Sequence, residues 1–374
     1  MKKFFTILCA LAIILIPSTL SASEMLLEAS GSYIMDSHLD ETPASATARA
    51  REEAKRAVVE KAGVYLQTYS KTVDFTLDID EVQTVAARLL KIQEESSNVE
   101  VVEENLLKFT VTIKALVDDL DENDLKALMR DKKTLAELTR KNKELQKKYD
   151  ALNQEMMRYR NQFNSASKAG KIGIKKDVAR NIERFYAVNE FAKGNEFSFR
   201  KEYERALSFY DAAVKLDPQL AEAYNNRGIV KYELGQFSEA VKDYTQALKL
   251  KSNYADALNN RGNAYAVLEQ FQNAEKDLRA ALKLNDKSAS IHNNFGNICF
   301  SQNKFNAAVD EYTQALNLNP NLSEAYYNRA VAYYLQNKLA EALTDLKKAF
   351  FLNVNDATSK ELYEKISRQL NEKS

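Results

Sequence analysis

The spacing of apolar residues divides the chain into regions of different predicted structure. Within residues 24–119, Met25–Met35 alternate apolar and polar side chains, which predicts a strand, and residues 44–69 place alanines along one face of a helix. Thr42 followed by Pro43 is typical of a helix start. The pattern therefore predicts a small α+β domain. A further strand is predicted over residues 72–79, a second helix over 81–95, and one or two closing strands over 99–117.

A seven-residue period follows in residues 121–164. Two series of mainly apolar residues occupy the positions that form a coiled-coil seam, Leu128, Leu135, Asn142, Tyr149, Met156 and Phe163, and Leu138, Leu145, Leu152 and Tyr159. A polar Asn142 in such a seam favours a parallel pair of chains, so we expect a homodimer through this segment. The alternative is a helix that packs back on its own chain, since Asp131 and Asn142 weaken the seam. After it, Gly170 and Gly173 predict a hinge over residues 165–176.

A 34-residue repeat governs residues 177–356. Small residues recur at this spacing in three columns, and large apolar residues recur in two. The small columns are Gly194, Gly228, Gly262, Gly296 and Ala330; Ala206, Ala240, Ala274, Ala308 and Ala342; and Ala213, Ala247, Ala281, Ala315 and Ala349. The large columns are Tyr203, Phe237, Phe271, Phe305 and Leu339, and Tyr210, Tyr244, Leu278, Tyr312 and Leu346. Each unit is therefore predicted to be a pair of closely packed helices, with residues 357–374 as a terminal capping helix.

The unit beginning at Ala221 resembles a tetratricopeptide repeat, with a small residue at position eight, alanines at positions twenty and twenty-seven and an aromatic residue at position twenty-four. The resemblance extends to five units, which start at Ala187, Ala221, Ala255, Ala289 and Ser323. It implies a mainly α fold, in which a tetratricopeptide α-solenoid follows the coiled-coil helix and the small α+β domain. Residues 24–119 contain a first strand with Gly31, an alanine-spaced helix over residues 46–66 and an alternating strand over residues 109–117. Through these elements they more loosely resemble the N-terminal module of secreted flagellar-assembly proteins and envelope lipoproteins, which implies an envelope accessory domain.

In the tetratricopeptide family the first helix of each unit lines a concave groove, and here these helices carry asparagines and aromatic residues. The candidate peptide-binding residues are Asn225, Asn226, Asn259, Asn260, Asn263, Asn293, Asn294, Asn297, Asn328, Tyr232 and Tyr334. An amide donates and accepts at once, so a row of amides can hold an extended backbone without reading its sequence. The alternative is that the amides are bonded only locally. On the first interpretation, replacing Asn226, Asn260 and Asn294 by alanine weakens binding and leaves the helicity unchanged.

Composition narrows the classes of function. Only 9 Gly and 4 Pro favour long helices, and Lys plus Arg equal Asp plus Glu at 53 each, so no uniform field for nucleic acid is expected. Two Cys and two His are too few for a disulfide framework or a His/Cys metal cluster. Motifs for phosphate binding, nucleophilic catalysis and zinc proteolysis are absent from the sequence. We therefore expect no enzyme, no metal, no cofactor and no small-molecule substrate.

The segment 1–23 predicts a secretion signal, with Lys2 and Lys3 before an apolar run from Phe4 to Ile16. Export to the periplasm, the cell envelope or the medium is expected. The sequence thus predicts a bacterial, non-enzymatic envelope scaffold that binds an extended protein segment in its repeat groove. The alternative is a structural component of an envelope or flagellar assembly that acts through the N-terminal module.

Overall fold

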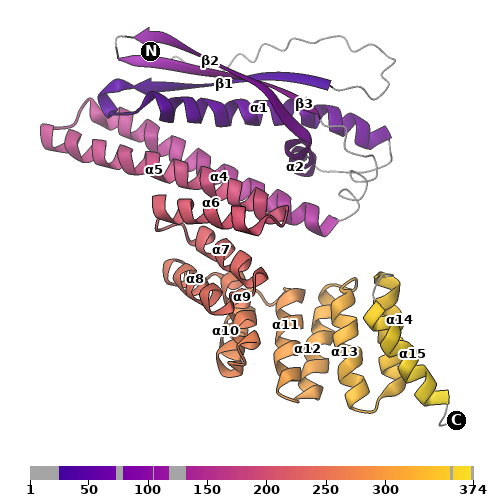
Figure 1. Ribbon diagram of the computed structural model, residues 1–374. Helices are drawn as coiled ribbons and strands as arrows, with labels where there is room; N and C mark the ends of the chain where they lie inside the picture. Colours follow the sequence, from indigo (N-terminus) through magenta and orange to yellow (C-terminus); the bar gives the residue numbers. More distant parts are fainter. Residues whose placement is uncertain (1–24, 73–78, 104, 118–131, 354–356, 372–374) are drawn as a thin grey trace. The chain divides into compact units, whose positions relative to one another are not determined.

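The computed structural model describes residues 25–72, 79–103, 105–117, 132–353 and 357–371 (Figure 1). The chain divides into two compact units, Met1–Ile182 and Glu183–Ser374. The predicted signal, most of the strand predicted over 72–79 and Leu128 of the heptad series lie outside the described residues. No described helix has both the length and the apolar character that a membrane span requires.

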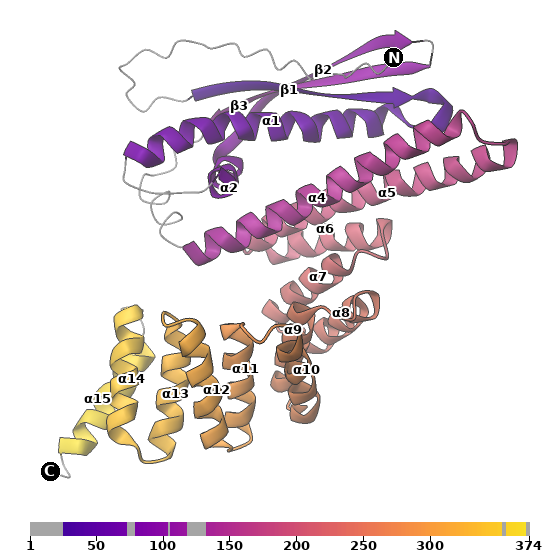
Figure 2. The ribbon, with the colours of Figure 1, turned by 180° about the vertical axis from the view of Figure 1, so that it is seen from behind.

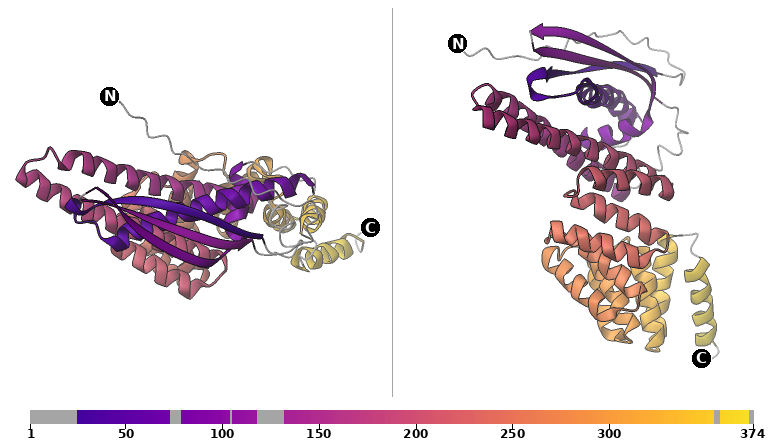
Figure 3. Two further views of the ribbon diagram at one scale, coloured as in Figure 1. Left: turned by 90° about the horizontal axis from the view of Figure 1, so that it is seen from above. Right: turned by 60° about the vertical axis from the view of Figure 1, so that its left-hand side comes forward.

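The first unit is built on a three-stranded antiparallel sheet. Its order is β1 (Met25–Asp36), β3 (Leu106–Val117) and β2 (Leu90–Glu103), so β3 is central. A short 3-10 helix, Ser37–Leu39, leads from β1 towards α1 (Pro43–Thr72), and α1 covers one face of the sheet (Figures 1 and 3).

Small residues let α1 lie very close to the sheet. The helix begins at Pro43 as predicted, and the Ser45 backbone N–H donates to Thr42 Oγ1 at 3.1 Å. Ala50 and Ala54 are completely buried within the core shared with β1 and β3. A Cβ atom at Gly31 of β1 would collide with the α1 backbone at Ala54, so this close approach requires glycine.

The helix predicted over 81–95 is shorter in the structure. α2 (Ile79–Leu89) ends at Leu89, and β2 begins at once with Leu90 opposite Val117 of β3. Residues beyond Leu90 lack a helical apolar period, and pairing with β3 satisfies their backbone groups instead.

α4 (Lys132–Phe163) and α5 (Lys168–Phe199) form an antiparallel pair within the first unit, and α5 continues past Ile182 into the second. Asn181 Nδ2 donates to the Leu152 carbonyl oxygen at 3.1 Å. Residues 168–176, predicted as part of a hinge, are helical, and Gly170 and Gly173 lie inside α5. Packing of Ile174 and Val178 against α4 explains why this helix continues through both glycines.

The heptad face of α4 is covered by its own chain. Met156 and Phe163 are buried with Leu39 and with Val178 of α5. Asn142 Nδ2 donates to Thr84 Oγ1 of α2 at 3.4 Å, where the sequence predicted a partner chain. These contacts correspond to the alternative of a helix packed on its own chain, because a heptad period identifies the apolar face but not what covers it.

The second unit is an array of paired antiparallel helices that begins with the C-terminal part of α5 (Figure 2). That part of α5 pairs with α6 (Tyr203–Leu216), where the Tyr210 hydroxyl donates to Asn195. The pairs that follow are α7 (Ala221–Glu233) and α8 (Phe237–Leu250), α9 (Ala255–Val267) and α10 (Phe271–Leu284), α11 (Ala289–Ser301) and α12 (Phe305–Leu318), and α13 (Ser323–Leu335) and α14 (Leu339–Leu352). The capping helix α15 (Ala357–Asn371) completes the array. A residue with positive φ turns the chain at the same position of each unit: Lys201, Gly235, Glu269, Asn303 and Asn337.

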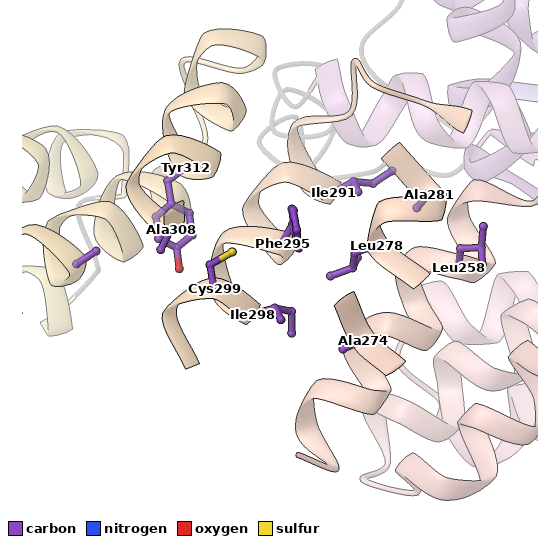
Figure 4. Packing of buried hydrophobic residues seen from close by; sticks show 11 residues of the cluster. Leu258, Ala274, Leu278, Ala281, Ile291, Phe295, Ile298, Cys299, Ala308 and Tyr312 are labelled. Carbon is purple, nitrogen blue, oxygen red and sulfur yellow. The ribbon is translucent and has the colours of Figure 1, made fainter. Parts of the chain in front are cut away.

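The predicted columns form the core of the array. Between α9 and α12, Leu278, Phe295 and Tyr312 are buried with Ala274 and Ala308 (Figure 4). The column glycines admit the large column opposite, since a Cβ at Gly296 would lie 2.5 Å from Tyr312 Cε1. The fold is therefore a mainly α solenoid that a small sheet precedes along the chain.

Candidate functional site

The asparagines of the first helices meet across successive repeats. At three interfaces an amide at position six donates to the amide at position five of the preceding unit. The bonds are Asn260 to Asn225 at 3.2 Å, Asn294 to Asn259 at 2.9 Å and Asn328 to Asn293 at 3.2 Å. They join α9 to α7, α11 to α9 and α13 to α11. We call the residues at positions five, six and nine of these helices the amide face.

The first interface follows the same rule with a different acceptor. Position five of the first unit is Phe191, which has no acceptor atom, and Asn226 Nδ2 donates instead to Asn195 Oδ1 at 2.8 Å. The amide of Asn226 also accepts from Asn225 at 3.1 Å. Each position-six amide therefore links two repeats.

At position nine, two of the asparagines accept hydrogen bonds from tyrosine hydroxyls and the third does not. Asn195 accepts from the Tyr210 hydroxyl and Asn297 accepts from the Tyr312 hydroxyl, both at 2.8 Å. The unit of Asn263 has no such hydroxyl, because Leu278 replaces tyrosine at position twenty-four. The Asn263 side chain is partly exposed and makes no hydrogen bond with any residue that the structure describes.

Burial divides the other candidates further. Asn225 and Asn293 are only 3% exposed, and Asn293 Nδ2 donates to Glu324 at 3.2 Å, so neither amide faces solvent. The remaining candidate amides are partly exposed, as are Tyr232 and Tyr334. Tyr232 packs edge-on against Phe237 with ring centroids 5.1 Å apart. The structure thus brings the predicted amides together and shows that most of them bond to one another.

Comparisons with known proteins agree with the repeat assignment. Models of the TPR repeat match residues 194–235, 230–269 and 296–337, and models of the tetratricopeptide repeat match 255–288 and 323–353. Residues 194–288 and 296–353 of the chain are therefore tetratricopeptide repeats. The sequence has no match among curated proteins.

Several solved structures are similar to part of this chain. YrrB, described as a TPR protein with an unusual peptide-binding site, is 26% identical, with a TM-score of 0.40 over 50% of this chain and 96% of its own. TTC0263, a TPR protein of Thermus thermophilus, is 21% identical, with a TM-score of 0.43 over 48% and 98%. PilW, described as a widely conserved type IV pilus biogenesis factor, is 22% identical, with a TM-score of 0.47 over 50% and 86%.

The tetratricopeptide arginines lie in helix interfaces, where they make bidentate ion pairs. Arg227 Nε and Nη2 donate to the two carboxylate oxygens of Asp243 at 2.8 and 2.5 Å. Arg261 and Arg329 pair in the same way with Asp277 and Asp345. Burial alone would lower the pKa of Arg227, but its hydrogen bonds and the charges of Asp243 and Asp211 outweigh this effect and raise it. These guanidinium groups therefore stabilise the contacts between helices, and their donors are occupied by aspartates of the chain itself.

Two of the five tetratricopeptide units lack this ion pair. The unit starting at Ala187 has Lys193 and Phe209 at the arginine and aspartate positions. In the unit starting at Ala289, Phe295 and Glu311 stand at the arginine and aspartate positions, and His292 Nδ1 lies 2.7 Å from Glu311 Oε2. The guanidinium carbon Cζ of Arg279, in the preceding unit, lies over the Phe295 ring, 5.0 Å from its centroid. Cys299 is buried in the same core as Phe295 (Figure 4), and burial raises the pKa of its thiol, which disfavours the nucleophilic thiolate.

The capping helix adds residues that the sequence interpretation missed. A hollow at the C-terminal end of the array is lined by Tyr327 of α13 and by residues of α15, namely Thr358, Glu361, Leu362, Lys365, Arg368 and Gln369. Lys365 Nζ lies 5.6 Å from the centre of the Tyr334 ring. Continuing the repeat numbering from Ala357 places Thr358, Glu361, Lys365 and Arg368 at positions two, five, nine and twelve. Extending the numbering into the capping helix would therefore have identified these residues from the sequence.

Proposed function

We propose that the tetratricopeptide array binds an extended segment of a partner protein along its amide face, without catalysis. The observation that carries this proposal is Asn263, a partly exposed amide in the middle of the array with no partner among the described residues. Its donor and acceptor can both pair with one peptide group. Asn259 and Asn297 lie on the same face, and Tyr232 and Tyr334 offer partly exposed rings for apolar side chains.

This proposal changes the residues to test. Asn226, Asn260 and Asn294 link repeats, so their replacement by alanine removes structural hydrogen bonds as well as any ligand contact. Asn263→Ala removes an amide that has no such role. We therefore expect Asn263→Ala to leave the unfolding midpoint unchanged and to weaken peptide binding.

The test uses twelve-residue peptides selected from a random display library against the intact protein. Loss of one hydrogen bond predicts binding weakened by about three- to tenfold in Asn263→Ala. Asn253→Ala, an exposed asparagine between repeats, is the control and should change neither binding nor stability. Leu278→Tyr gives Asn263 the partner that Tyr312 gives Asn297, so binding should weaken there too. Selected peptides that bind Asn263→Ala and Tyr334→Ala as tightly as the wild type would contradict the proposal.

We also propose that the protein is exported and acts in the bacterial cell envelope. The support is the segment of residues 1–23, with its basic start and apolar run. Fractionation of cells that express the tagged protein should place it outside the cytoplasm, and Phe5→Arg/Leu11→Arg should retain it inside. Equal fractionation of both forms would refute export by this segment.

A further inference from the structure

The two edges of the sheet in the first unit are covered differently. Side chains of β1 alternate, with Ala29, Gly31 and Met35 buried under α1 and Ser30 and Ser32 exposed. On β2, by contrast, every side chain from Lys91 to Glu103 is exposed. Among the described residues, no strand pairs with the outer edge of β2 (Figure 1).

The exposed strand is apolar at several positions. Ile92, Val99, Val101 and Val102 are 47, 49, 75 and 48% exposed. Val99 and Val101 lie opposite Phe109 and Leu107 of β3, so they continue the row of side chains that packs under α1. A long edge strand of this kind promotes aggregation unless something covers it, and natural sheets protect such edges with lysine, proline or short strands. β2 contains no proline and only one lysine, Lys91.

The register of β2 defines the length of the open edge. Irregularities lie between Ile92 and Glu94 and between Val101 and Glu103. The regular stretch between them, residues 94–101, is about 27 Å long at the usual rise of an antiparallel strand. One partner strand of about eight residues matches this length.

Charge indicates the chemistry of that strand. From residue 94 to 103 the charged side chains are all acidic, namely Glu94, Glu95, Glu100 and Glu103. The first two form ion pairs inside the unit, Glu94 with Lys114 at 2.5 Å and Glu95 with Arg51 at 2.6 Å. Glu100 and Glu103 have no ion-pair partner within the described part of the chain.

These carboxylates disfavour two candidate occupants. Pairing β2 with a second copy doubles the carboxylates along one edge, with only Lys91 of each copy to offset them. Residues 118–131 of the same chain hold six acidic and two basic residues, so they would add repulsion as well. A basic strand from another protein suits this edge best.

We propose that β2 is a docking edge for an extended segment of a partner protein in which basic residues alternate with apolar ones. The segment adds a fourth strand to the sheet through main-chain hydrogen bonds. Its apolar side chains pack beside Val99 and Val101, and its basic side chains face Glu100 and Glu103. The residues of this edge belong to the first unit and those of the amide face to the second, so each can be tested by its own substitutions.

The test uses the intact protein and a synthetic eight-residue peptide that alternates valine with lysine and threonine. We expect binding and slowed amide hydrogen exchange at residues 94–101. Glu100→Lys/Glu103→Lys should weaken binding at least tenfold, and a peptide with glutamate in place of lysine should restore it. Glu60→Lys/Glu364→Lys makes the same charge change at exposed helix positions and should bind like the wild type.

The controls separate strand addition from simple charge attraction. A peptide that is N-methylated at every residue keeps its charge but has no N–H group to donate from either edge, and it should not bind. Equal binding of that peptide, or exchange slowed only elsewhere, would overturn the proposal. So would protection of residues 94–101 without peptide that grows with protein concentration, because a second copy would then occupy the edge.

Discussion

The tetratricopeptide array and helix α4 both have an apolar stripe that can be read from the sequence. Only in the array does the sequence also predict which residues pack against that stripe. In the array the stripe recurs in every repeat unit, and each copy packs on the next. On α4 the stripe has a seven-residue period, and unrelated segments cover it, among them Leu39 and α5. A period shows which face is buried, whereas repetition along the chain also shows what buries it.

The largest effect on stability is expected when a side chain of the α4 stripe is truncated. Met156 is 1% exposed and packs on Leu39, Phe163 and Val178. Met156→Ala should destabilise α4 by about 2–5 kcal/mol, through lost burial and the cavity that remains. Amide hydrogen exchange of α4, followed by mass spectrometry, measures this loss. The adjacent Met157 is 61% exposed, so Met157→Ala should change stability by less than about 0.5 kcal/mol.

Protein concentration decides whether the stripe is covered within one chain. The structure predicts that the effect of Met156→Ala is the same at two concentrations that differ fiftyfold. An effect that shrinks as the concentration rises would instead support the two-chain coiled coil.

Replacing glycine by alanine should change the free energy of unfolding in opposite directions in the array and in the N-terminal part of α5. A Cβ at Gly296 would lie 2.5 Å from Tyr312 Cε1, so Gly296→Ala should destabilise the array by about 1–3 kcal/mol. A Cβ at Gly173 of α5 meets nothing within 4 Å, and Gly173→Ala should stabilise that helix by up to about 1 kcal/mol. Urea unfolding followed by circular dichroism gives both values. Equal effects would show that the glycine column of the repeats has no packing role.

Much of the array could be predicted because each of its rules is local and repeated. The glycine and tyrosine columns lie on consecutive helices, and the structure puts them in contact. The start of α1 at Pro43 was predictable for a similar reason, since its signal is two adjacent residues. The switch from α2 to β2 at Leu90 was not, because pairing with β3, which begins only at Leu106, overrides the local pattern.

The candidate site was predictable as a set of residues but not as a set of roles. The repeat numbering placed the amides on one face, and the structure brings them together. Whether an amide is bonded depends on a residue in another helix, as Asn297 depends on Tyr312. The same dependence leaves Asn263 open where Leu278 replaces tyrosine, and a comparison of the two columns would have found it.

Alkaline pH should weaken the array through its buried phenols. Burial raises the pKa of Tyr210, Tyr244 and Tyr312, which are neutral in the folded state. The unfolded value is about 10, so their contribution is fully present below about pH 10 and is lost as pH rises above it. Each phenol then removes up to about 1.4 kcal/mol of unfolding free energy per pH unit. Urea midpoints between pH 8 and 11 measure the slope, which Tyr244→Phe should reduce.

The smallest expected effect is the difference in stability loss between phenylalanine substitutions at two tyrosines of the same column. The Tyr312 hydroxyl donates to Asn297, so Tyr312→Phe should lower the free energy of unfolding by about 1 kcal/mol at pH 7. The Tyr244 hydroxyl has no hydrogen bond within the described residues, so Tyr244→Phe should lower it by less than about 0.5 kcal/mol. Both substitutions keep the ring that fills the space opposite glycine. The difference therefore isolates the amide bond from ring packing. Equal losses would mean that the tyrosine column acts only by packing, and that Asn263 is no more open than Asn297.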